Sequence, residues 1–308
     1  MTVPAVAVVI VTYNCRDWIE RCLAALPAAL AGLPAEVVVV DNASADGSAD
    51  LVAAGHPELV LIRNPVNAGF AAAVNLGVAR SSAPWVLLLN PDMEPRPGSL
   101  RALYDFAGQR PGHGIYGGRT LRPDGSVEPS SCWALPTLWS TFCFASGLST
   151  AFRRTPLLDP ESMGGWQRDS VREVGMVTGC LLLTPRPVWQ ELGGLDEHYF
   201  VYGEDADFSS RARAAGYRPI VTPAAEVVHA IGVSSGDGAG KMPLLLAGKV
   251  SYARRRFTEP RRTVAITLLR LGVLVRAAGS RLTGRGAKWR AAWARRDAWW
   301  SGFGERAR

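Results

Sequence analysis

The sequence contains little cysteine, and its cysteines have none of the spacings that mark disulfide frameworks or metal sites. Five cysteines occur in 308 residues, at positions 15, 22, 132, 143 and 180, with no CxxC pair among them. Disulfides persist in oxidising compartments, so this usage favours reduced thiols in a cytosolic protein. The N-terminus lacks the basic stretch of a signal peptide, and its apolar run is typical of a strand. We therefore expect a cytoplasmic protein.

Long apolar runs and internal repeats are also absent. No segment reaches the ~18 uninterrupted apolar residues of a membrane-spanning helix, so we expect no transmembrane span. With 48% hydrophobic and 20% charged residues, the composition is that of a globular protein with a large core rather than a disordered chain. The length fits one large α/β domain with an appendage, or two modest domains.

Charge is unevenly distributed along the chain, whose net charge is +7. From residue 249 to 308 there are 16 Lys and Arg against 3 Asp and Glu, a net +13. The first 248 residues hold 18 basic and 24 acidic side chains, a net −6. We therefore expect two regions, a catalytic domain over residues 1–240 and a basic helical extension over 241–308.

Short aliphatic runs alternate with helical patterns over the first third of the chain. Strands are predicted at 6–14, 36–44, 59–64 and 85–92, and helices at 16–30, 46–54 and 68–80. Alternation of this kind predicts an α/β fold with a doubly wound, mostly parallel central sheet. Further on, the pattern predicts strands at 174–185 and 218–223, with a helix at 187–192 between them.

Polar side chains follow each of the first four predicted strands. The clusters are Thr12-Tyr13-Asn14, Asp41-Asn42, Asn64 and Asn90-Pro91-Asp92. These residue types are ordinary turn formers. However, ligands of such sheets bind at the carboxyl ends of the strands, and four clusters at one edge favour a binding site. No G-x-G-x-x-G or Walker A pattern is present, so the edge is better suited to a mononucleotide than to a dinucleotide.

Two groups of carboxylates are candidates for chemistry. Asp92 follows a buried strand beside the predicted nucleotide pocket, where Mg²⁺ or Mn²⁺ bound to a diphosphate would find an oxygen ligand. Glu204, Asp205 and Asp207 open a helix, and their mutual repulsion is a way to raise the pKa of a general base. Asp207 is expected to pair with Arg211 four residues on, which leaves Glu204 and Asp205 for function.

The middle section, residues 119–172, loses periodicity and is rich in Pro, Ser and Trp. We expect loops and short helices that cover the sheet edge and shape a binding cleft. Its tryptophans, Trp133, Trp139 and Trp166, are more often core residues than ligand platforms. His229 at the end of EVVHA is a structural residue unless it approaches Asp92.

The motifs together resemble the inverting glycosyltransferases of family 2, which have the GT-A fold, and most closely their bacterial rhamnosyltransferase-like branch. The segments VVIVTYN, VVVVDNASADGS, NAGFAAAVNLG, WVLLLNPD and GGLDEHYFVYGEDADFSSRARAAGY, followed by His229, occur in the order of that family. The likeness covers residues 5–232. Each segment alone is weakly specific, whereas the ordered set is highly specific.

The resemblance implies a role for each matching position. Asp41 would accept the N3–H of a pyrimidine base and Tyr13 would pack on the base. Asp205 would be the general base that activates an acceptor hydroxyl, which Glu204 helps to hold, and Asp92 would bind a divalent cation, Mg²⁺ or Mn²⁺, with His229. The remaining nucleotide and donor-sugar residues would be Thr12, Asn14, Asn42, Asn67, Gly69, Asn75, Asn90 and Gly179.

Two departures from the family pattern bear on function. The metal motif begins with Asn90 instead of Asp, which removes one negative charge near the diphosphate. The Gln-x-x-Arg-Trp signature of processive polysaccharide synthases is absent, which favours transfer of a single sugar. dTDP-L-rhamnose is the favoured donor, with UDP-galactofuranose, UDP-N-acetylglucosamine and GDP-mannose as alternatives, and a non-catalytic scaffold that binds a nucleotide sugar as a different class of protein.

The basic extension has a composition of its own. Residues 263–279 are mostly apolar, and residues 284–300 combine Arg and Lys with four tryptophans. Basic residues interleaved with Trp are typical of an interfacial helix at an anionic membrane, so we expect peripheral attachment at the inner face of the cell membrane. The lipid-linked or glycan acceptor that the resemblance implies favours the same location. The alternative is packing on the catalytic domain or on a second subunit of a homo-oligomer. No nucleic-acid-binding module is present, so no nucleic-acid partner is expected.

Overall fold

The computed structural model describes residues 3–229, 238–283 and 286–304. The strands of its main sheet are β1 (Val6–Thr12), β2 (Ala35–Asp41), β3 (Val60–Arg63), β4 (Trp85–Leu89), β5 (Met93–Pro95), β6 (Tyr116–Leu121), β7 (Val127–Glu128), β9 (Arg172–Glu173), β11 (Leu181–Pro185) and β12 (Ile220–His229). Two short strands, β8 (Cys132–Trp133) and β10 (Met176–Val177), pair with each other in a separate small sheet.

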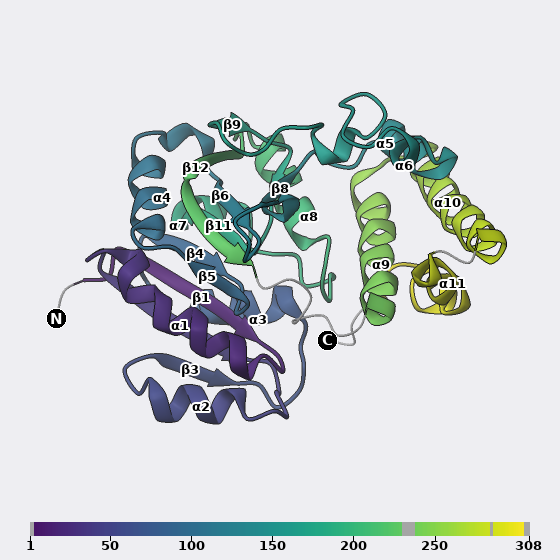
Figure 1. Cartoon of the computed structure of the whole chain (residues 1–308). Coiled ribbons are helices and arrows are strands. Elements are labelled where there is room, and N and C mark those ends of the chain that lie inside the picture. The colour runs from purple at the N-terminus through teal and green to yellow at the C-terminus, as the bar shows by residue number, and fades with distance from the viewer. Residues whose placement is uncertain (1–2, 230–237, 284–285, 305–308) are drawn as a thin grey trace.

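The main sheet runs in the order β3-β2-β1-β4-β11-β6-β12-β5, with β7 added beside β6 and β9 beside β12 (Figure 1). β3, β2, β1 and β4 are mutually parallel. β11 is antiparallel to both β4 and β6, and β12 is parallel to β6, so the longer strands other than β11 all point the same way. Their carboxyl ends therefore meet at one edge of the sheet, as the sequence predicted.

The helices are α1 (Arg16–Leu30), α2 (Ser48–Gly55), α3 (Phe70–Ala79), α4 (Ser99–Gly108), α5 (Leu138–Ser146), α6 (Leu148–Ala151), α7 (Arg186–Glu191), α8 (Glu204–Ala214), α9 (Gly238–Arg256), α10 (Arg261–Thr283) and α11 (Ala287–Ala294). α1, α2 and α4 pack on one face of the sheet, while α3, α7 and α8 pack on the other. The α/β, doubly wound arrangement is therefore confirmed.

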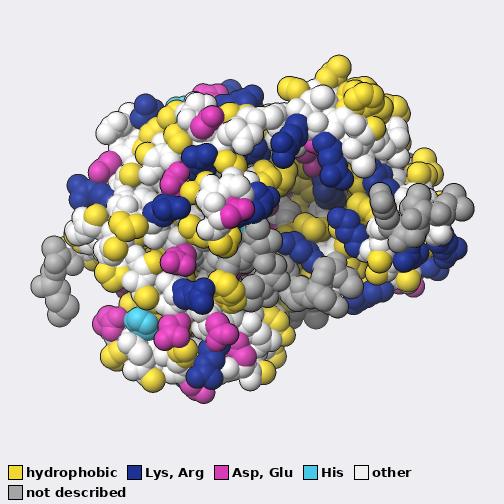
Figure 2. Space-filling model, viewed as in Figure 1, with side chains coloured by type: hydrophobic (Ala, Val, Ile, Leu, Met, Phe, Trp, Pro, Cys, Tyr) yellow, Lys and Arg dark blue, Asp and Glu magenta, His cyan; other side chains and the backbone are white. Residues whose placement is uncertain are grey.

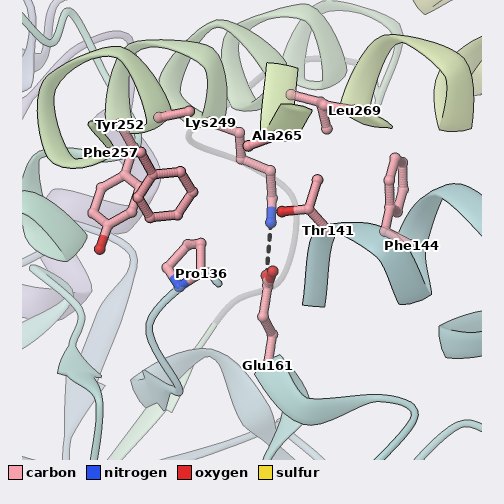
Figure 3. Close-up of a pocket in the computed structure, with 10 residues that line it drawn as sticks. Pro136, Thr141, Phe144, Glu161, Lys249, Tyr252, Phe257, Ala265 and Leu269 are labelled. Carbon is pink, nitrogen blue, oxygen red and sulfur yellow. Dashed lines mark hydrogen bonds and ion pairs between the residues drawn. The ribbon is translucent and has the colours of Figure 1, made fainter. Parts of the chain in front are cut away.

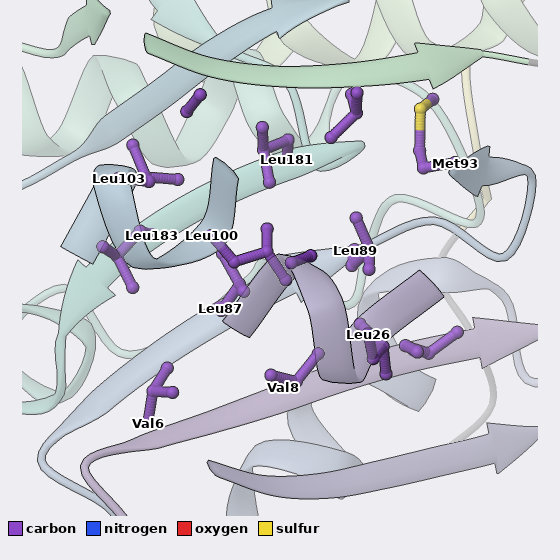
Figure 4. Packing of buried hydrophobic residues seen from close by; sticks show 14 of the residues in the cluster. Val6, Val8, Leu26, Leu87, Leu89, Met93, Leu100, Leu103, Leu181 and Leu183 are labelled. Carbon is purple, nitrogen blue, oxygen red and sulfur yellow. The ribbon is translucent and has the colours of Figure 1, made fainter. Parts of the chain in front are cut away.

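The aliphatic runs form strands because both faces of the sheet are covered. In the core between the sheet and helices α1 and α4, Val8, Leu87, Leu89 and Leu103 are almost completely buried (Figure 4). Burial of each such side chain stabilises the fold by about 1.5–3 kcal/mol relative to exposure to water. This gain outweighs the weak strand preference of leucine.

The predicted strand at 174–185 is wrong as a single element. Residues 176–177 belong to the small sheet and residues 181–185 to the main sheet. Between them, Thr178 directs its hydroxyl at the carbonyl oxygens of Ser130 and Ser131, at 2.8 and 3.2 Å. Side-chain bonds of this type compete with the strand ladder and turn the chain out of it.

The three C-terminal helices have their own apolar core, centred on Leu246, Val250, Leu269 and Trp299. Phe144 of α5 packs against this core, so a helix from the middle of the sequence joins the C-terminal group (Figure 1). The helical C-terminal region agrees with the sequence, and the division of the chain at residue 240 stays a prediction.

α10 differs from the expectation of no transmembrane span. Residues 261–281 have the length and mean hydropathy, 1.4, of a candidate span, although 39% of that segment is buried inside the protein. Arg270 and Arg276 interrupt the apolar run in the sequence, but the average over the helix remains apolar. Core helices of soluble proteins meet the same criterion, so α10 by itself is weak evidence for a span.

Candidate active site

A cavity of about 1460 Å³ lies at the carboxyl edge of the sheet. It extends from the ends of the N-terminal strands, past the start of α8, to the middle section and α9. The predicted site residues that line it are Tyr13, Asn14, Asn42, Asn67, Gly69, Asn90, Gly179, Glu204, Asp205 and His229. Residues from seven separate parts of the chain therefore meet in one space.

Four predicted residues do not line the cavity. Thr12, Asp41 and Asp92 are buried, with 3% or less of each side chain exposed. Asp41 Oδ2 accepts the backbone N–H of Ser44 at 3.1 Å, whereas its Oδ1 has no hydrogen-bond partner among the described residues. Asn75 instead binds the backbone N–H and carbonyl of Leu195, at 3.0 and 2.8 Å, away from the sheet edge.

Asn42 uses its side-chain amide to shape the loop before α3. Its Nδ2 donates to Asn67 Oδ1 at 3.0 Å and to the Gly69 carbonyl at 3.2 Å. Its Oδ1 accepts from Asn64 Nδ2 at 2.9 Å and from the Ala68 N–H at 3.1 Å. The polar residues after β2 and β3 therefore build the wall of the cavity at the end where the sequence predicts a nucleotide, called the nucleotide end below.

The stretch Asn90-Pro91-Asp92-Met93 is a tight turn between β4 and β5. The Met93 N–H donates to the Asn90 carbonyl at 3.2 Å, and Pro91 occupies the second position, where its fixed φ is favourable. Met93 then pairs with His229 in the antiparallel register of β5 and β12. This register brings His229 next to Asp92, which lies 137 positions earlier in the chain.

His229 lies between two carboxylates. Its Nε2 is 3.4 Å from Asp92 Oδ2, and its Nδ1 is 3.3 Å from Glu128 Oε2. Burial acts to lower the pKa of His229, but the hydrogen bonds that its ring N–H groups donate to Asp92 and Glu128 raise it to about 9. Although burial acts to raise the pKa of Glu128, the His229 and Ser130 contacts hold it below its usual value.

Glu128 was missed in the sequence because it lies in the section without periodicity. β7 is only two residues long, and its antiparallel pairing with β6 places Glu128 opposite Thr120 at the sheet edge. A lone Glu in a Pro- and Ser-rich segment gives no signal of this position. Only the pairing of distant strands reveals it.

The residues at this edge fit a cation held jointly with a substrate, rather than one held by protein alone. Among the described residues, no group of three or more His, Cys, Asp and Glu side chains is arranged to hold a metal ion. Asp92 and His229 nevertheless offer a carboxylate and an imidazole at 3.4 Å from each other. Mg²⁺ commonly binds one or two carboxylates plus the phosphates of its substrate, and the Asp92 carboxylate matches that donor set. His229 can join it as a neutral imidazole, after it releases the proton that its raised pKa retains.

Glu204 and Asp205 occupy the first turn of α8 and face the cavity. The helix begins after Gly203, whose φ of 104° is in the region that favours glycine. Burial raises the pKa of Glu204 well above its usual value, and the neighbouring Asp205 adds to this. Burial also raises the pKa of Asp205, against the opposing effect of the Ala206 N–H, which donates to its Oδ1 at 2.7 Å.

Asp207 is a structural residue, as predicted. It is fully buried and its Oδ2 accepts from Arg211 Nε at 2.8 Å. Its Oδ1 also pairs with Arg256 at the end of α9. This second contact, which the sequence did not indicate, attaches the C-terminal helices to the helix that carries Glu204 and Asp205.

The cysteines are buried, whereas two of the three tryptophans of the middle section line the cavity. All five cysteines are free and buried, and burial raises the pKa of Cys15 to about 11 and that of Cys180 to about 12, so these thiols stay protonated. Trp133 and Trp166 line the cavity, whereas Trp139 is 44% exposed. The expectation that the tryptophans are core residues is therefore wrong for Trp133 and Trp139, whereas Trp166 is partly buried against the core.

Comparison with known proteins identifies relatives. The sequence model of Glycosyl transferase family 2 matches residues 7–165. The N-acetylglucosaminyl-diphospho-decaprenol L-rhamnosyltransferase of Mycobacterium tuberculosis is 34% identical over 241 residues, which cover 72% of this chain and 75% of that protein.

Two solved structures share the fold. The mannosyltransferase PcManGT from Pyrobaculum calidifontis, in complex with GDP-Man and Mn²⁺, superposes with a TM-score of 0.55 at 20% identity, over 97% of this chain and 81% of that one. GalNAc-T7 with UDP, GalNAc and Mn²⁺ superposes with a TM-score of 0.57 at 14% identity, over 82% of this chain and 51% of that one. The fold is therefore GT-A-like.

Proposed function

The chain belongs to glycosyltransferase family 2, and from this premise we propose that it transfers one L-rhamnosyl residue from dTDP-L-rhamnose to a sugar hydroxyl of a lipid-diphosphate acceptor. The product would be an intermediate of a cell-envelope glycan. The transferred sugar and the acceptor class are those in the name of the 34% identical rhamnosyltransferase. The dTDP nucleotide is the donor favoured by the sequence resemblance. The observation that carries the proposal is the shared cavity, which has Asp205 in its wall between the nucleotide edge and the middle section.

Asp205 is the general base in this mechanism. It removes the proton of the acceptor hydroxyl as the oxygen attacks the anomeric carbon, and the nucleoside diphosphate leaves from the opposite face, so the configuration inverts in one step. Burial raises the pKa of Asp205, which brings a carboxylate closer to the range where a base is effective near neutral pH. Glu204 Oε2, buried and without a hydrogen-bond partner among the described residues, would hold the acceptor hydroxyl.

The nucleotide is held by the ends of the N-terminal strands. Asp41 reads the N3–H that thymine and uracil share, through its Oδ1. Tyr13, 44% exposed at the cavity wall, packs on the base. Asp92 and His229 would hold a Mg²⁺ or Mn²⁺ ion at the diphosphate. When bound, the ion neutralises charge that develops on the leaving diphosphate.

A donor panel tests the proposal. The purified protein is incubated with Mg²⁺ or Mn²⁺, an N-acetylglucosaminyl-diphospho-lipid and one donor at a time, either dTDP-L-rhamnose, UDP-galactofuranose, UDP-N-acetylglucosamine or GDP-mannose. Transfer from dTDP-L-rhamnose is expected, and a higher rate with another donor would reassign the sugar. Binding without transfer or hydrolysis would mark a scaffold instead.

Asp205→Asn is expected to lower kcat by a factor of about 10²–10⁴ while the donor Kd stays the same, because a general base acts only in the chemical step. Asp17→Asn, at an exposed position on α1, serves as the matched control. Full activity of Asp205→Asn would remove Asp205 from the role of base.

Peripheral attachment to the inner membrane surface belongs to the same proposal. α10 buries one apolar face in the C-terminal core and exposes another, with Val264, Leu271, Leu274 and Val275 each at least 40% exposed. A helix that is apolar on both faces and flanked by Arg is suited to an anionic interface. L271Q/L274Q/V275Q is expected to bind anionic liposomes more weakly than the native protein. Unchanged co-sedimentation would contradict attachment through α10.

A further inference from the structure

The cavity continues beyond Asp205 into a part that is rich in basic side chains. There it is walled by residues 122–168 and by α9, and the space-filling view shows Lys and Arg around a hollow between the catalytic body and the C-terminal helices (Figure 2). The basic residues of this part are Arg122, Arg153, Arg154, Arg168, Lys241 and Lys249. The nucleotide end of the cavity, in contrast, has no Lys or Arg among its described lining residues, which include Tyr13, Asn14, Asn42, Asn67 and Asn90.

Three of these cations already have partners. Lys249 Nζ is 2.6 Å from Glu161 Oε2, in a side pocket of about 30 Å³ beside Thr141 and Phe144 (Figure 3). Arg122 donates to Ser126 Oγ at 3.3 Å and to the backbone of Val127. Arg168 is buried and donates to the carbonyl oxygens of residues 162 and 166. These side chains hold the middle section in place.

Arg153, Arg154 and Lys241 are different. Among the described residues, none of the three forms a side-chain ion pair with a carboxylate. The two arginines are exposed and follow α6, while Lys241 lies on α9 with its Nζ 5.8 Å from the centroid of the Tyr202 ring. Tyr202 leads directly into Glu204 and Asp205, so the three cations extend from beside the predicted base to the rim of the cavity.

Apolar side chains border the rim at the two arginines. Phe152, adjacent to Arg153, is 50% exposed, and Leu157 is 68% exposed. α6 is also attached to α10, because Arg276 donates to Thr150 Oγ1 at 3.2 Å. The cavity that contains the predicted base therefore also has cations in its wall, and exposed apolar groups adjoin the two arginines in the chain.

We infer that Arg153, Arg154 and Lys241 bind the diphosphate of the acceptor, a sugar linked through a diphosphate to a lipid chain. The inference rests on the proposed function, since it places the acceptor in the same cavity. A lipid-linked sugar has three kinds of group that these residues can receive: a reactive hydroxyl for the carboxylates, a diphosphate for the cations and an apolar chain for the exposed apolar groups. Arginine forks match phosphate oxygens in geometry and charge, and lysine adds a point charge. The chain then leaves over Phe152 and Leu157 towards the exposed face of α10.

The test compares two acceptors that differ only in the diphosphate. Farnesyl-diphospho-N-acetylglucosamine has the group, and farnesyl N-acetylglucosaminide lacks it. For R153Q/R154Q we expect the KM of the first acceptor to rise about tenfold or more, with kcat and donor KM within about twofold, because charge-assisted contacts to phosphate are lost. The KM of the second acceptor should stay unchanged. K241Q should act in the same direction, and R80Q, at an exposed position directly after α3, should have no effect.

Direct binding separates this inference from the proposed function. Calorimetry with farnesyl-diphospho-N-acetylglucosamine, without donor, should show the same loss of about tenfold in R153Q/R154Q even if no sugar is transferred. Equal losses for both acceptors, or a rise in donor KM alone, would overturn the inference. The inference would also be overturned if R153Q/R154Q lost binding to anionic liposomes but kept full acceptor affinity. The two arginines would then bind bilayer headgroups and not the acceptor.

Discussion

Neighbouring carboxylates in α8 have different environments, although they lie within one turn of helix. Asp207 is fully buried and is paired with Arg211 and Arg256. Glu204 and Asp205 are without a cation at ion-pair distance among the described residues, so burial raises the pKa of each. Asp207 is neutralised by two cations and is structural, whereas Glu204 and Asp205 have no such cation within the described part of the chain and stay available for chemistry. The sequence spacing indicated the Asp207–Arg211 pair but not the Asp207–Arg256 pair.

Glu204 should lower the stability of the fold near neutral pH. Its folded pKa is raised, so the native state keeps a proton that the unfolded chain releases. Stability is therefore highest below the unfolded pKa, near 4.3, and falls as the pH rises from there towards the folded value. Glu204→Gln is expected to raise Tm by roughly 1–3 °C at pH 7.5, with a smaller gain at pH 5.

The control for this measurement is Glu20→Gln, an exposed position on α1. Differential scanning fluorimetry at several pH values gives the Tm of both variants. A gain for Glu204→Gln that does not shrink on acidification would contradict the assignment of a raised pKa. Activity of this variant should fall, since the stabilising change removes a group of the site.

Asp41→Asn should weaken binding of pyrimidine nucleotides. The Oδ1 of Asp41 has no hydrogen-bond partner among the described residues, and an amide in its place presents a donor to the N3–H of the base. A hydrogen bond to a charged group contributes about 1.5–3 kcal/mol, so the Kd of dTDP and of UDP should rise by about 10- to 150-fold. Calorimetry measures both, and unchanged Kd values would mean that Asp41 does not read the base.

At the scale of elements, α9 is the C-terminal helix that contacts the helix carrying the predicted base. Arg256 pairs with Asp207, and Arg255 is 2.5 Å from Asp196. Gly248 packs against the turn before α8. A Cβ on residue 248 would lie 2.1 Å from the Tyr202 carbonyl oxygen. The position of α9 and the position of the predicted base are therefore linked.

Gly248→Ala should disturb this contact. Either α9 or the turn at residues 202–205 has to move, and overpacking of this kind typically costs about 1–3 kcal/mol. We expect a lower free energy of unfolding, from urea titration, together with a lower kcat. Gly108→Ala in α4, where a Cβ would meet no atom within 4 Å, is the control and should be neutral or stabilising.

The sequence predicted correctly those elements whose apolar residues follow a strand or helix pattern within the segment itself. β1, β2 and β4 are continuous aliphatic runs, and the helices after them follow regular spacing. β6, with two glycines in YGGRTL, has no such run and is a strand because β11 and β12 pair with it on both sides. Glu128 and the Arg256 contact were missed for the same reason, since long-range pairing determines them.

At the scale of the whole molecule, the C-terminal helices are part of the folded protein. Phe144 of α5 packs into their core, and Lys249 holds the middle section through Glu161. A chain that ends at residue 258 would leave Leu246 and Val250 without the cover of α10 and α11. Exposed apolar area costs about 25 cal/mol per Å², so we expect this truncated protein to aggregate on size-exclusion chromatography. A monodisperse product with native Tm would show that α9 stays folded without α10 and α11.

The two ends of the cavity are encoded by different stretches of the chain. The nucleotide end comes from residues before Pro91, whereas the basic end comes from the middle section and α9. Substitutions in one stretch therefore leave the residues of the other untouched. Under the proposed function, donor choice and acceptor choice are therefore encoded in different stretches. A chimaera that exchanges residues 122–168 and α9 between relatives is expected to use a new acceptor with the same donor.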